Sequence, residues 1–240
     1  MDVKDIPNIN TKIAEFNIYL KGKVGDKYRK NLIGELKTFF HSISDLLPRM
    51  PKFPKIKVQK PVIKWIEKEP QNEIFEFIAQ HHLPIFIFMR YTACRPNEAS
   101  GFLKTNIFWD RREFALATVL GKGKTIKYKI QNKREKMFPF IPELDDVFSK
   151  AKDDPSPFVF HMDGRPYTIR RLEKIWDRAN NLATEKYGTP RINLYNGMKH
   201  SFVCQRLGDY TYDQISEVLG ISPEMVRQRY GKYQTKKWWG

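Results

Sequence analysis

Cysteine and long apolar runs are scarce in this sequence, and each scarcity excludes a class of protein. Two cysteines among 240 residues are too few for a disulfide framework or a cysteine metal site, so we expect a reducing compartment, the cytoplasm. The longest apolar run, residues 83–89, contains a proline and falls far short of the ~20 residues that a bilayer-spanning helix needs. The N-terminus is rich in Asp, Lys and Asn and is unlike a signal peptide, so we expect no membrane partner.

Motifs for metal and nucleotide chemistry are also missing. Asp145 and Asp146, like Asp153 and Asp154, are adjacent pairs, and adjacent carboxylates cannot face one ion together in a regular helix. No Gly-x-x-x-x-Gly-Lys-Ser/Thr loop is present to hold a nucleotide phosphate. The sequence therefore argues against a metal-dependent nuclease or transposase, and we expect neither a metal site nor a cofactor.

Positive charge, by contrast, is abundant. The chain has 43 Lys and Arg against 27 Asp and Glu, a formal net charge of +16, and a hydrophobic content of 41% that allows a real core. A charge excess of this size repels itself unless an anionic partner neutralises it, and nucleic acid is the commonest such partner. We therefore expect a folded protein that binds nucleic acid.

Proline and lysine divide the chain. Apolar residues recur at helical spacing over residues 11–47, which predicts two helices. Prolines then break the pattern, so we expect a helical region over 1–50, an extended Lys/Pro-rich linker over 51–70 and a larger domain over 71–240. The linker is either a solvated spacer or a basic strap around nucleic acid. As a strap, it would contact phosphates through Lys52, Lys55, Lys57 and Lys60.

The larger domain changes its periodicity along the chain. Helical spacing runs from Ile74 to Met89 and stops at Arg95-Pro96, where proline predicts a junction between two helices. Residues 106–142 instead predict a small antiparallel sheet with basic turns. The expected fold class is α+β, a mainly helical domain with a small three-stranded antiparallel sheet, preceded by a short helical arm. Further elements are expected as helices at 142–152, 168–186, 194–207 and 212–219, and a strand at 158–160.

The C-terminal stretch has a strong helix start. Ser222 suits the N-cap and Pro223 the first helical position. Val226, Tyr230 and Tyr233 then follow at i, i+4 and i+7, so spacing alone makes Tyr230 a core aromatic. Residues 213–230 also resemble a helix-turn-helix reader with its glycine in the turn.

Three motifs occur in an order that neither of these interpretations needs. They are Thr92-Ala-Cys-Arg-Pro-Asn-Glu98, Tyr195-Asn-Gly-Met-Lys-His-Ser201, and Leu219-Gly220 with Tyr230 ten residues beyond that glycine. Together they resemble the catalytic domain of the tyrosine recombinases of the phage-integrase family. The resemblance covers residues 71–233. The N-terminal helices look like part of the family's core-binding domain and are fewer than the whole of it, so we expect a shortened version.

The resemblance implies a site-specific recombinase or integrase that acts on duplex DNA. Tyr230 would attack a backbone phosphate, the 5′-hydroxyl would leave, and a 3′-phosphotyrosine would conserve the bond energy without a cofactor. Arg95 matches the first family arginine; its alternative role is a surface salt bridge with Glu98. The family also assembles on its DNA, which implies a dimer or tetramer here.

This sequence departs from the family pattern at the second cluster and after the glycine. Asn196 stands where the family has a histidine; it cannot shuttle protons, but it can hydrogen-bond a phosphate or the attacking oxygen. Lys199 keeps the arginine's charge without its bidentate geometry. Ile221 stands where a histidine or tryptophan would donate a hydrogen bond. We expect these departures to weaken catalysis. The alternative is a non-enzymatic DNA-binding protein, either a degenerate integrase or a helix-turn-helix regulator.

The general acid and the supporting residues complete the expected site. The family places a lysine on a β-hairpin to protonate the leaving oxygen; among the lysines of residues 121–136 we choose Lys133, with Lys124 and Lys136 as alternatives. Lys122 and Lys124 are expected to contact phosphates. We expect His200 to be a buried histidine that supports its helix.

Overall fold

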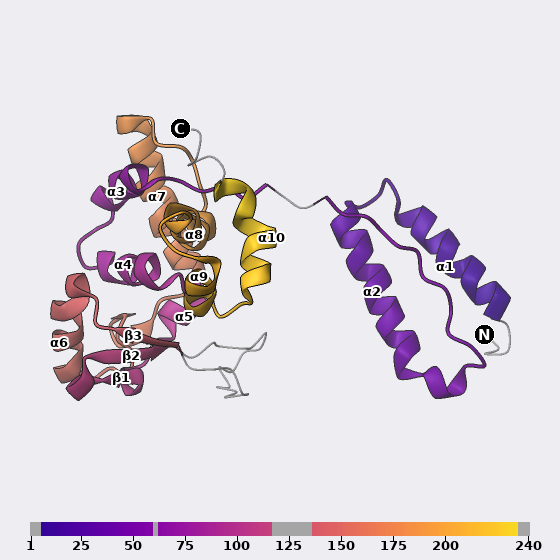
Figure 1. Ribbon diagram of the computed structural model, residues 1–240, viewed down its shortest axis with the longest axis horizontal. Helices are drawn as coiled ribbons and strands as arrows, with labels where there is room; N and C mark the ends of the chain where they lie inside the picture. Colours follow the sequence, from indigo (N-terminus) through magenta and orange to yellow (C-terminus); the bar gives the residue numbers. More distant parts are fainter. Residues whose placement is uncertain (1–5, 60–61, 117–135, 235–240) are drawn as a thin grey trace. The chain divides into compact units, whose positions relative to one another are not determined.

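The computed structural model describes residues 6–59, 62–116 and 136–234, and the chain forms two compact units, Met1–Val62 and Ile63–Gly240 (Figure 1). The first unit contains α1 (Ile6–Leu20), α2 (Asp26–Ser42) and a 3-10 turn, η1 (Ser44–Leu46). The two expected helices are therefore confirmed. Gly22 lies between them with a φ of 87°, a left-handed conformation that glycine adopts without steric penalty.

After η1 the chain runs back along both helices of this unit. The backbone N–H of Lys52 donates to the side-chain oxygen of Asn10 on α1 at 2.8 Å, and the Phe53 ring lies 5.9 Å from that of Phe40 on α2. Lys52, Lys55 and Lys57 are exposed, while the apolar residues between them are half-buried. The extended segment thus turns its lysines to solvent.

The second unit is the mainly helical α+β domain with a small three-stranded antiparallel sheet that the sequence predicted (Figure 1). Its helices and single turns, in chain order, are α3 (Lys68–Glu76), α4 (Leu83–Thr92), α5 (Pro96–Ser100), η2 (Lys104–Asn106), η3 (Trp109–Arg111), η4 (Pro142–Leu144), α6 (Asp145–Asp153), α7 (Ile169–Tyr187), η5 (Asn196–His200), α8 (Ser201–Arg206), α9 (Tyr212–Leu219) and α10 (Pro223–Gln234). Its strands are β1 (Ile107–Phe108), β2 (Glu113–Leu116), β3 (Lys136–Pro139), β4 (His161–Met162) and β5 (Arg165–Pro166).

The three-stranded sheet has the order β1-β2-β3. Phe114 pairs with Phe138 across β2 and β3, and their rings stack at 5.3 Å, which fixes the register through a cross-strand aromatic pair. The chain between β2 and β3, where the sequence places further strand residues and Lys122, Lys124 and Lys133, lies outside the described residues.

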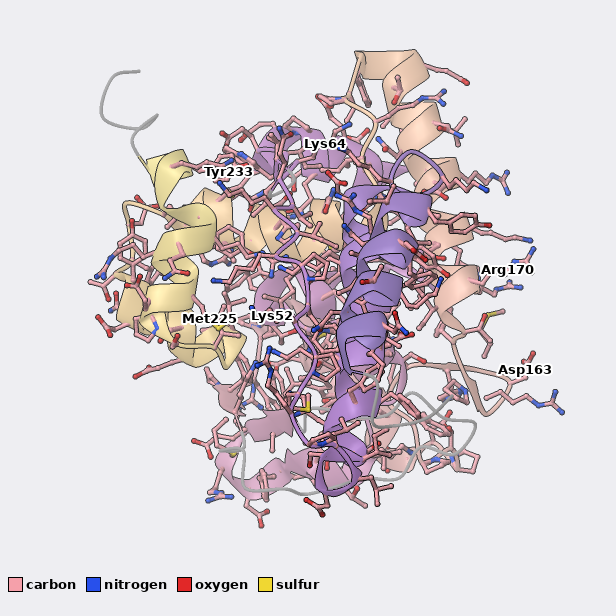
Figure 2. All side chains as sticks on the ribbon, turned by 90° about the vertical axis from the view of Figure 1, so that its right-hand side faces the viewer. Lys52, Lys64, Asp163, Arg170, Met225 and Tyr233 are labelled. Atoms are coloured by element: carbon pink, nitrogen blue, oxygen red, sulfur yellow. The ribbon has the colours of Figure 1, made fainter. Side chains whose placement is uncertain are left out.

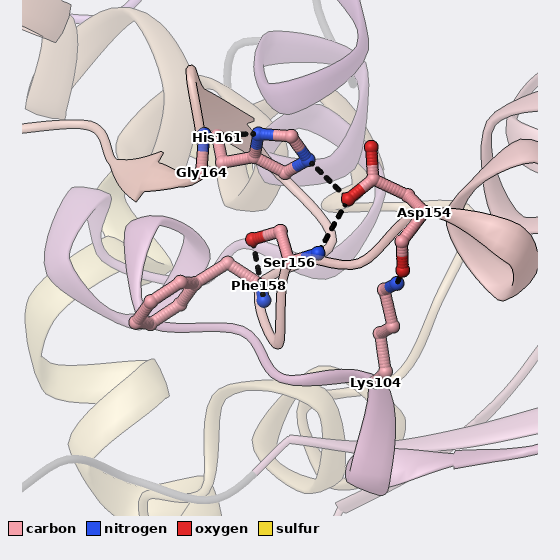
Figure 3. A network of polar contacts seen from close by, with 6 residues as sticks. All are labelled: Lys104, Asp154, Ser156, Phe158, His161 and Gly164. Carbon is pink, nitrogen blue, oxygen red and sulfur yellow. Dashed lines mark hydrogen bonds and ion pairs between the residues drawn. The ribbon is translucent and has the colours of Figure 1, made fainter.

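The strand expected at residues 158–160 is reduced to one antiparallel bridge between Phe158 and Leu103, with the Val159 N–H donating to the Phe102 carbonyl at 3.0 Å. Side chains take two of the nearby backbone donors: Asp154 accepts from the Ser156 N–H at 2.7 Å, and Ser156 Oγ accepts from the Phe158 N–H at 3.2 Å (Figure 3). His161 Nε2 lies 3.1 Å from Asp154, and Lys104 donates to the Asp154 carbonyl. Regular strand pairing begins only at His161, in the β4–β5 hairpin.

The core of this unit consists of two clusters. The larger is rich in aromatic rings, among them Phe88, Phe102 and Phe114, and includes the fully buried Trp176 of α7. The smaller is formed by α8, α9 and α10 and contains Val226 and Tyr230. Within the described residues, no helix is long and apolar enough to cross a bilayer.

Candidate active site

Arg95 occupies the expected junction between two helices. Helix α4 ends as Ala93 turns into the left-handed region with φ 51°, and Arg95 caps α5 with Pro96 at the first position. The Glu98 carboxylate accepts from the Arg95 backbone N–H at 2.7 Å and from Nη1 at 2.8 Å. Glu98 is 8% exposed and the Arg95 side chain 49%, so an anchored guanidinium presents its other N–H groups toward solvent.

Lys199 lies in η5, a single π-helical turn. Gly197 of this turn lets it approach Trp176: a Cβ at Gly197 would lie 2.3 Å from the indole ring. Gln71 of α3 donates to the Gly197 carbonyl at 2.7 Å. π-Helical turns are rare and occur frequently at functional sites. The turn is thus held by packing against Trp176 and by the hydrogen bond from Gln71.

Burial, opposed by Glu98 and aided by Arg95 and Lys136, lowers the pKa of Lys199 to about 8. Lys199 is only 8% exposed. The cations that affect the pKa of Lys199 come from separate elements: Arg95 from the start of α5 and Lys136 from β3. The structure therefore brings Arg95 and Lys199 together, and it adds the alternative hairpin residue Lys136 to them.

Lys136 reaches this place across Gly220, the glycine that follows α9. A Cβ at Gly220 would lie 2.5 Å from Lys136 Cε and 3.0 Å from Nζ, and the φ of Gly220 is 64°. The positive φ favours glycine here, whereas a Cβ would displace only the flexible end of the Lys136 side chain. Ile221, the next residue, is half-buried and packs against the smaller core cluster.

Tyr230 lies in α10 and is almost fully buried, with 1% exposure. Its hydroxyl oxygen lies 2.7 Å from Nδ1 of His200, which is 5% exposed. Burial, aided by the charges of Arg229 and Lys199, lowers the pKa of His200 to about 4, so the imidazole is neutral at pH 7. Burial raises the pKa of Tyr230, although Arg229 opposes the rise.

Tyr233, one turn later, fixes α10 to the beginning of the unit. Its hydroxyl donates to the Ile63 carbonyl at 2.9 Å and accepts from the Ile63 N–H at 2.8 Å. Tyr233 is labelled on α10 in Figure 2. The helix that carries Tyr230 is thereby held at two points, by His200 and by the backbone of Ile63.

Asn196 and Tyr195 lie at the start of the π-helical turn, and both are half-buried. Asn196 accepts at its carbonyl from Ser201 Oγ at 2.9 Å. The Tyr195 ring meets His200 edge-on, with centroids 4.9 Å apart and planes at 88°. The Tyr195 side chain lies near enough to the Arg95 guanidinium to interact with it electrostatically.

Sequence reasoning missed Tyr195, Arg229 and the contact between Lys136 and Gly220. Each adjoins a residue that the motifs identified, but adjacency alone does not say which side chain turns toward the site. Lys60 and the hairpin residues Lys122, Lys124 and Lys133 lie outside the described residues. Among the described residues, no group of three or more His, Cys, Asp or Glu could hold a metal ion.

Comparisons with known proteins place this domain among DNA recombinases and integrases by fold. No protein-family model matches the sequence, and no curated protein matches it. The Tn1549 transposon integrase in complex with transposon right end DNA is similar with a TM-score of 0.74 and 15% identity over 92% of this chain and 80% of that chain.

Two further solved structures agree. The XerH site-specific recombinase bound to palindromic difH substrate gives a TM-score of 0.63 and 18% identity, over 95% of this chain and 70% of that one. A lambda integrase dimer bound to a COC′ core site gives 0.62 and 11%, over 94% and 64%. The chain has the fold of the tyrosine recombinases.

Proposed function

We propose that this protein is a site-specific DNA recombinase or integrase that cleaves and rejoins duplex DNA through Tyr230. The observation that carries the proposal is the convergence of Arg95, Lys199 and Lys136, from separate elements, in the domain that buries Tyr230 against His200. A role for Tyr230 in core packing, or in a helix-turn-helix, would explain its helix but would not require these cations nearby. The fold comparisons supply the class of reaction in which such a set is used.

The chemistry follows from where negative charge develops. The Tyr230 oxygen bonds to phosphorus, the bond to the 5′ oxygen breaks, and a 3′-phosphotyrosine forms. Charge grows on the non-bridging oxygens, and fixed cations stabilise that charge more than they stabilise the ground state. Arg95 suits two oxygens at once, and Lys199 adds a single buried charge.

Lys136 takes the role of general acid in this proposal. Its ammonium passes a proton to the departing 5′ oxygen and regains it in the reverse step, in which the 5′-hydroxyl attacks the phosphotyrosine. Lys133 and Lys124 remain the other candidates on the same hairpin. Replacement of each by alanine separates the three, because a duplex with sulfur in place of the 5′ leaving oxygen needs no general acid and restores cleavage only in the variant that lacks the true acid.

Tyr230 must become accessible before it can attack, since 1% exposure leaves no room for a phosphate. His200, with its neutral imidazole, is the group placed to take the Tyr230 proton, provided that Nδ1 is the unprotonated nitrogen. A bound phosphate would offset the charge of Lys199, which depresses the pKa of His200, so the base strengthens when substrate arrives.

Duplex DNA is the partner that the exposed charge fits. Lys52, Lys55 and Lys57 face solvent on the extended segment of the first unit. On the second unit a hollow of α7 is lined by Thr168, Arg170, Arg171, Lys174, Ile175 and Arg178. Figure 2 shows Arg170 extending outward from this helix. These contacts would go to phosphates and carry little sequence information. Assembly of two or four copies on DNA is part of the same proposal.

A DNA-binding protein without catalysis is the second candidate. Ile221 offers no side-chain donor, Asn196 cannot shuttle protons, and Tyr230 is buried as a core residue would be. These departures alone do not require the second candidate. Loss of one preorganised donor lowers rates by about 10²–10³ in other enzymes and leaves residual catalysis.

Covalent capture separates the two candidates. The protein is incubated with a pool of random-sequence duplexes that carry a nick in one strand, so that the short 5′-hydroxyl fragment diffuses away after cleavage and the adduct is trapped. We expect adducts that survive detergent, are destroyed by protease and are absent with Tyr230→Phe. Tight DNA binding with no adduct on any duplex favours the second candidate.

A further inference from the structure

The Tyr195 hydroxyl lies at the half-exposed edge of the cation cluster, beside the Arg95 guanidinium. We propose that it donates a hydrogen bond to a non-bridging oxygen of the scissile phosphate, in place of the donor that Ile221 lacks. Tyr195 performs no covalent step, since the bond to phosphorus is made by Tyr230. The inference rests on the proposed function and adds a catalytic residue to it.

The ring of Tyr195 is positioned by its neighbour in the π-helical turn. It meets His200 edge-on at 4.9 Å, and His200 in turn holds the Tyr230 hydroxyl at 2.7 Å. Tyr195 is also near enough to Tyr230 for the two phenols to interact electrostatically. A phosphate that Tyr230 could attack, with Arg95 on its oxygens, would therefore lie within reach of the Tyr195 hydroxyl.

The direction of hydrogen bonding leaves the Tyr195 proton for the substrate. Arginine donates and cannot accept, so a hydrogen bond between Arg95 and the Tyr195 hydroxyl can only use the Tyr195 oxygen as acceptor. A hydroxyl that accepts from a cation is polarised and becomes a stronger donor. The O–H bond then points its positive end to the place where the transition state collects negative charge.

Neighbouring hydroxyls are already committed elsewhere. Thr92 donates to the Phe88 carbonyl at 2.7 Å and is 1% exposed. Ser201 donates to the Asn196 carbonyl at 2.9 Å and is 0% exposed. Tyr195 differs from both in exposure and in its charged partner, which makes it the better neutral donor.

The test uses a duplex recovered by covalent capture and compares Tyr195→Phe with the wild-type protein. We expect the first-order rate of adduct formation to fall about 10²-fold, as for loss of an oxyanion donor elsewhere, with DNA affinity nearly unchanged. In one diastereomer of a methylphosphonate at the scissile position the accepting oxygen is absent, so the penalty should shrink to less than about threefold. Tyr210→Phe, at a side chain with 51% exposure, is the matched control and should leave the rate unchanged.

Two results would overturn the inference while the proposed function stands. One is a Tyr195→Phe rate within about threefold of wild type on the phosphodiester. The other is an undiminished penalty on both methylphosphonate diastereomers, which would assign Tyr195 a role in packing. An adduct that persists in Tyr230→Phe and vanishes in Tyr195→Phe would make Tyr195 the nucleophile and would overturn both the inference and the proposed role of Tyr230. If wild type itself forms no adduct on any duplex, the proposed function fails, and this inference with it.

Discussion

Nδ1 of His200 lies 2.7 Å from the hydroxyl oxygen of Tyr230, although the two residues are 30 positions apart in the sequence. The contact joins the π-helical turn that carries Lys199 to the helix that carries the proposed nucleophile. Both groups are buried, so the hydrogen bond is shielded from water and competes with any movement that would expose Tyr230.

The buried neutral His200 predicts a loss of stability in mild acid. Its pKa of about 4 in the folded protein lies below the ordinary 6.5, so the unfolded chain binds more protons between these values and the free energy of unfolding falls as pH drops from 6.5 to 4. We expect His200 to contribute roughly 2 kcal/mol to this fall. Urea unfolding from pH 7 to pH 4.5 measures it.

His200→Gln is the control for that measurement, because it leaves the lowered pKa of His82 in place. The variant should be less stable at pH 7 and should lose less stability on acidification than wild type. Equal slopes in the two proteins would show that the imidazole of His200 is not held neutral.

Lys199 predicts a pH dependence of DNA binding on the alkaline side. Burial lowers its pKa to about 8, so the free protein loses this cation as pH rises above 8, and at pH 9 protonating it for a phosphate costs about 1.4 kcal/mol, or tenfold in affinity. Lys199→Arg keeps its charge and should bind with a shallower pH dependence between pH 7 and pH 9. Titrations by fluorescence anisotropy that gave parallel curves for both proteins would contradict the predicted role of Lys199.

Gly197 predicts a steric limit on the π-helical turn. A Cβ there would lie 2.3 Å from the Trp176 ring, and Trp176 is fully buried with its indole N–H bonded to the Ile192 carbonyl at 2.7 Å. Gly197→Ala should therefore destabilise the protein by about 2–3 kcal/mol. The measurement is urea unfolding of the purified variant.

Gly231→Ala in α10 is the matched control. The nearest atoms to its Cβ are side-chain atoms of Tyr212 and Arg227 at 3.3 and 3.7 Å, and alanine favours a helix over glycine by up to ~1 kcal/mol. It should leave stability within about 1 kcal/mol of wild type. Equal losses in Gly197→Ala and Gly231→Ala would show that the indole can move aside.

The exposed lysines of the extended segment predict a salt effect. If Lys52, Lys55 and Lys57 bind phosphates, their joint replacement by alanine should reduce the slope of log affinity against log salt by about 2.7, or ~0.9 for each phosphate that a lysine no longer neutralises. Affinity should fall to a similar degree on unrelated duplexes, because phosphate contacts carry no sequence information. An unchanged slope would mean that the segment is a solvated spacer.

Local signals predicted the fold better than they predicted the site. Ser222 and Pro223 start α10 as expected, with the Met225 N–H bonded to Ser222 Oγ at 3.3 Å, because helix caps depend on neighbouring residues only. The strand expected at 158–160 is only a single bridge between Phe158 and Leu103, and Ser156 Oγ takes the Phe158 N–H, which apolar spacing does not reveal.

The site depends on contacts between distant segments. Regular helical spacing places residues 196, 199 and 200 on one face, whereas the π-helical turn, in which Gly197 lies against Trp176, alters their phase. The passage of Lys136 over Gly220 joins β3 to the end of α9. Arg95, Lys199 and Tyr230 came from motifs, but their neighbours Tyr195 and Arg229 required the three-dimensional structure.

The chemical identity of the attachment point tests the central claim most directly. The covalent protein–DNA adduct is digested with protease and nuclease, and the residue that retains a nucleotide is located by mass spectrometry. Attachment through a 3′-phosphate to the oxygen of Tyr230 is the predicted result. Attachment to any other residue, or the persistence of an adduct in Tyr230→Phe, would contradict it.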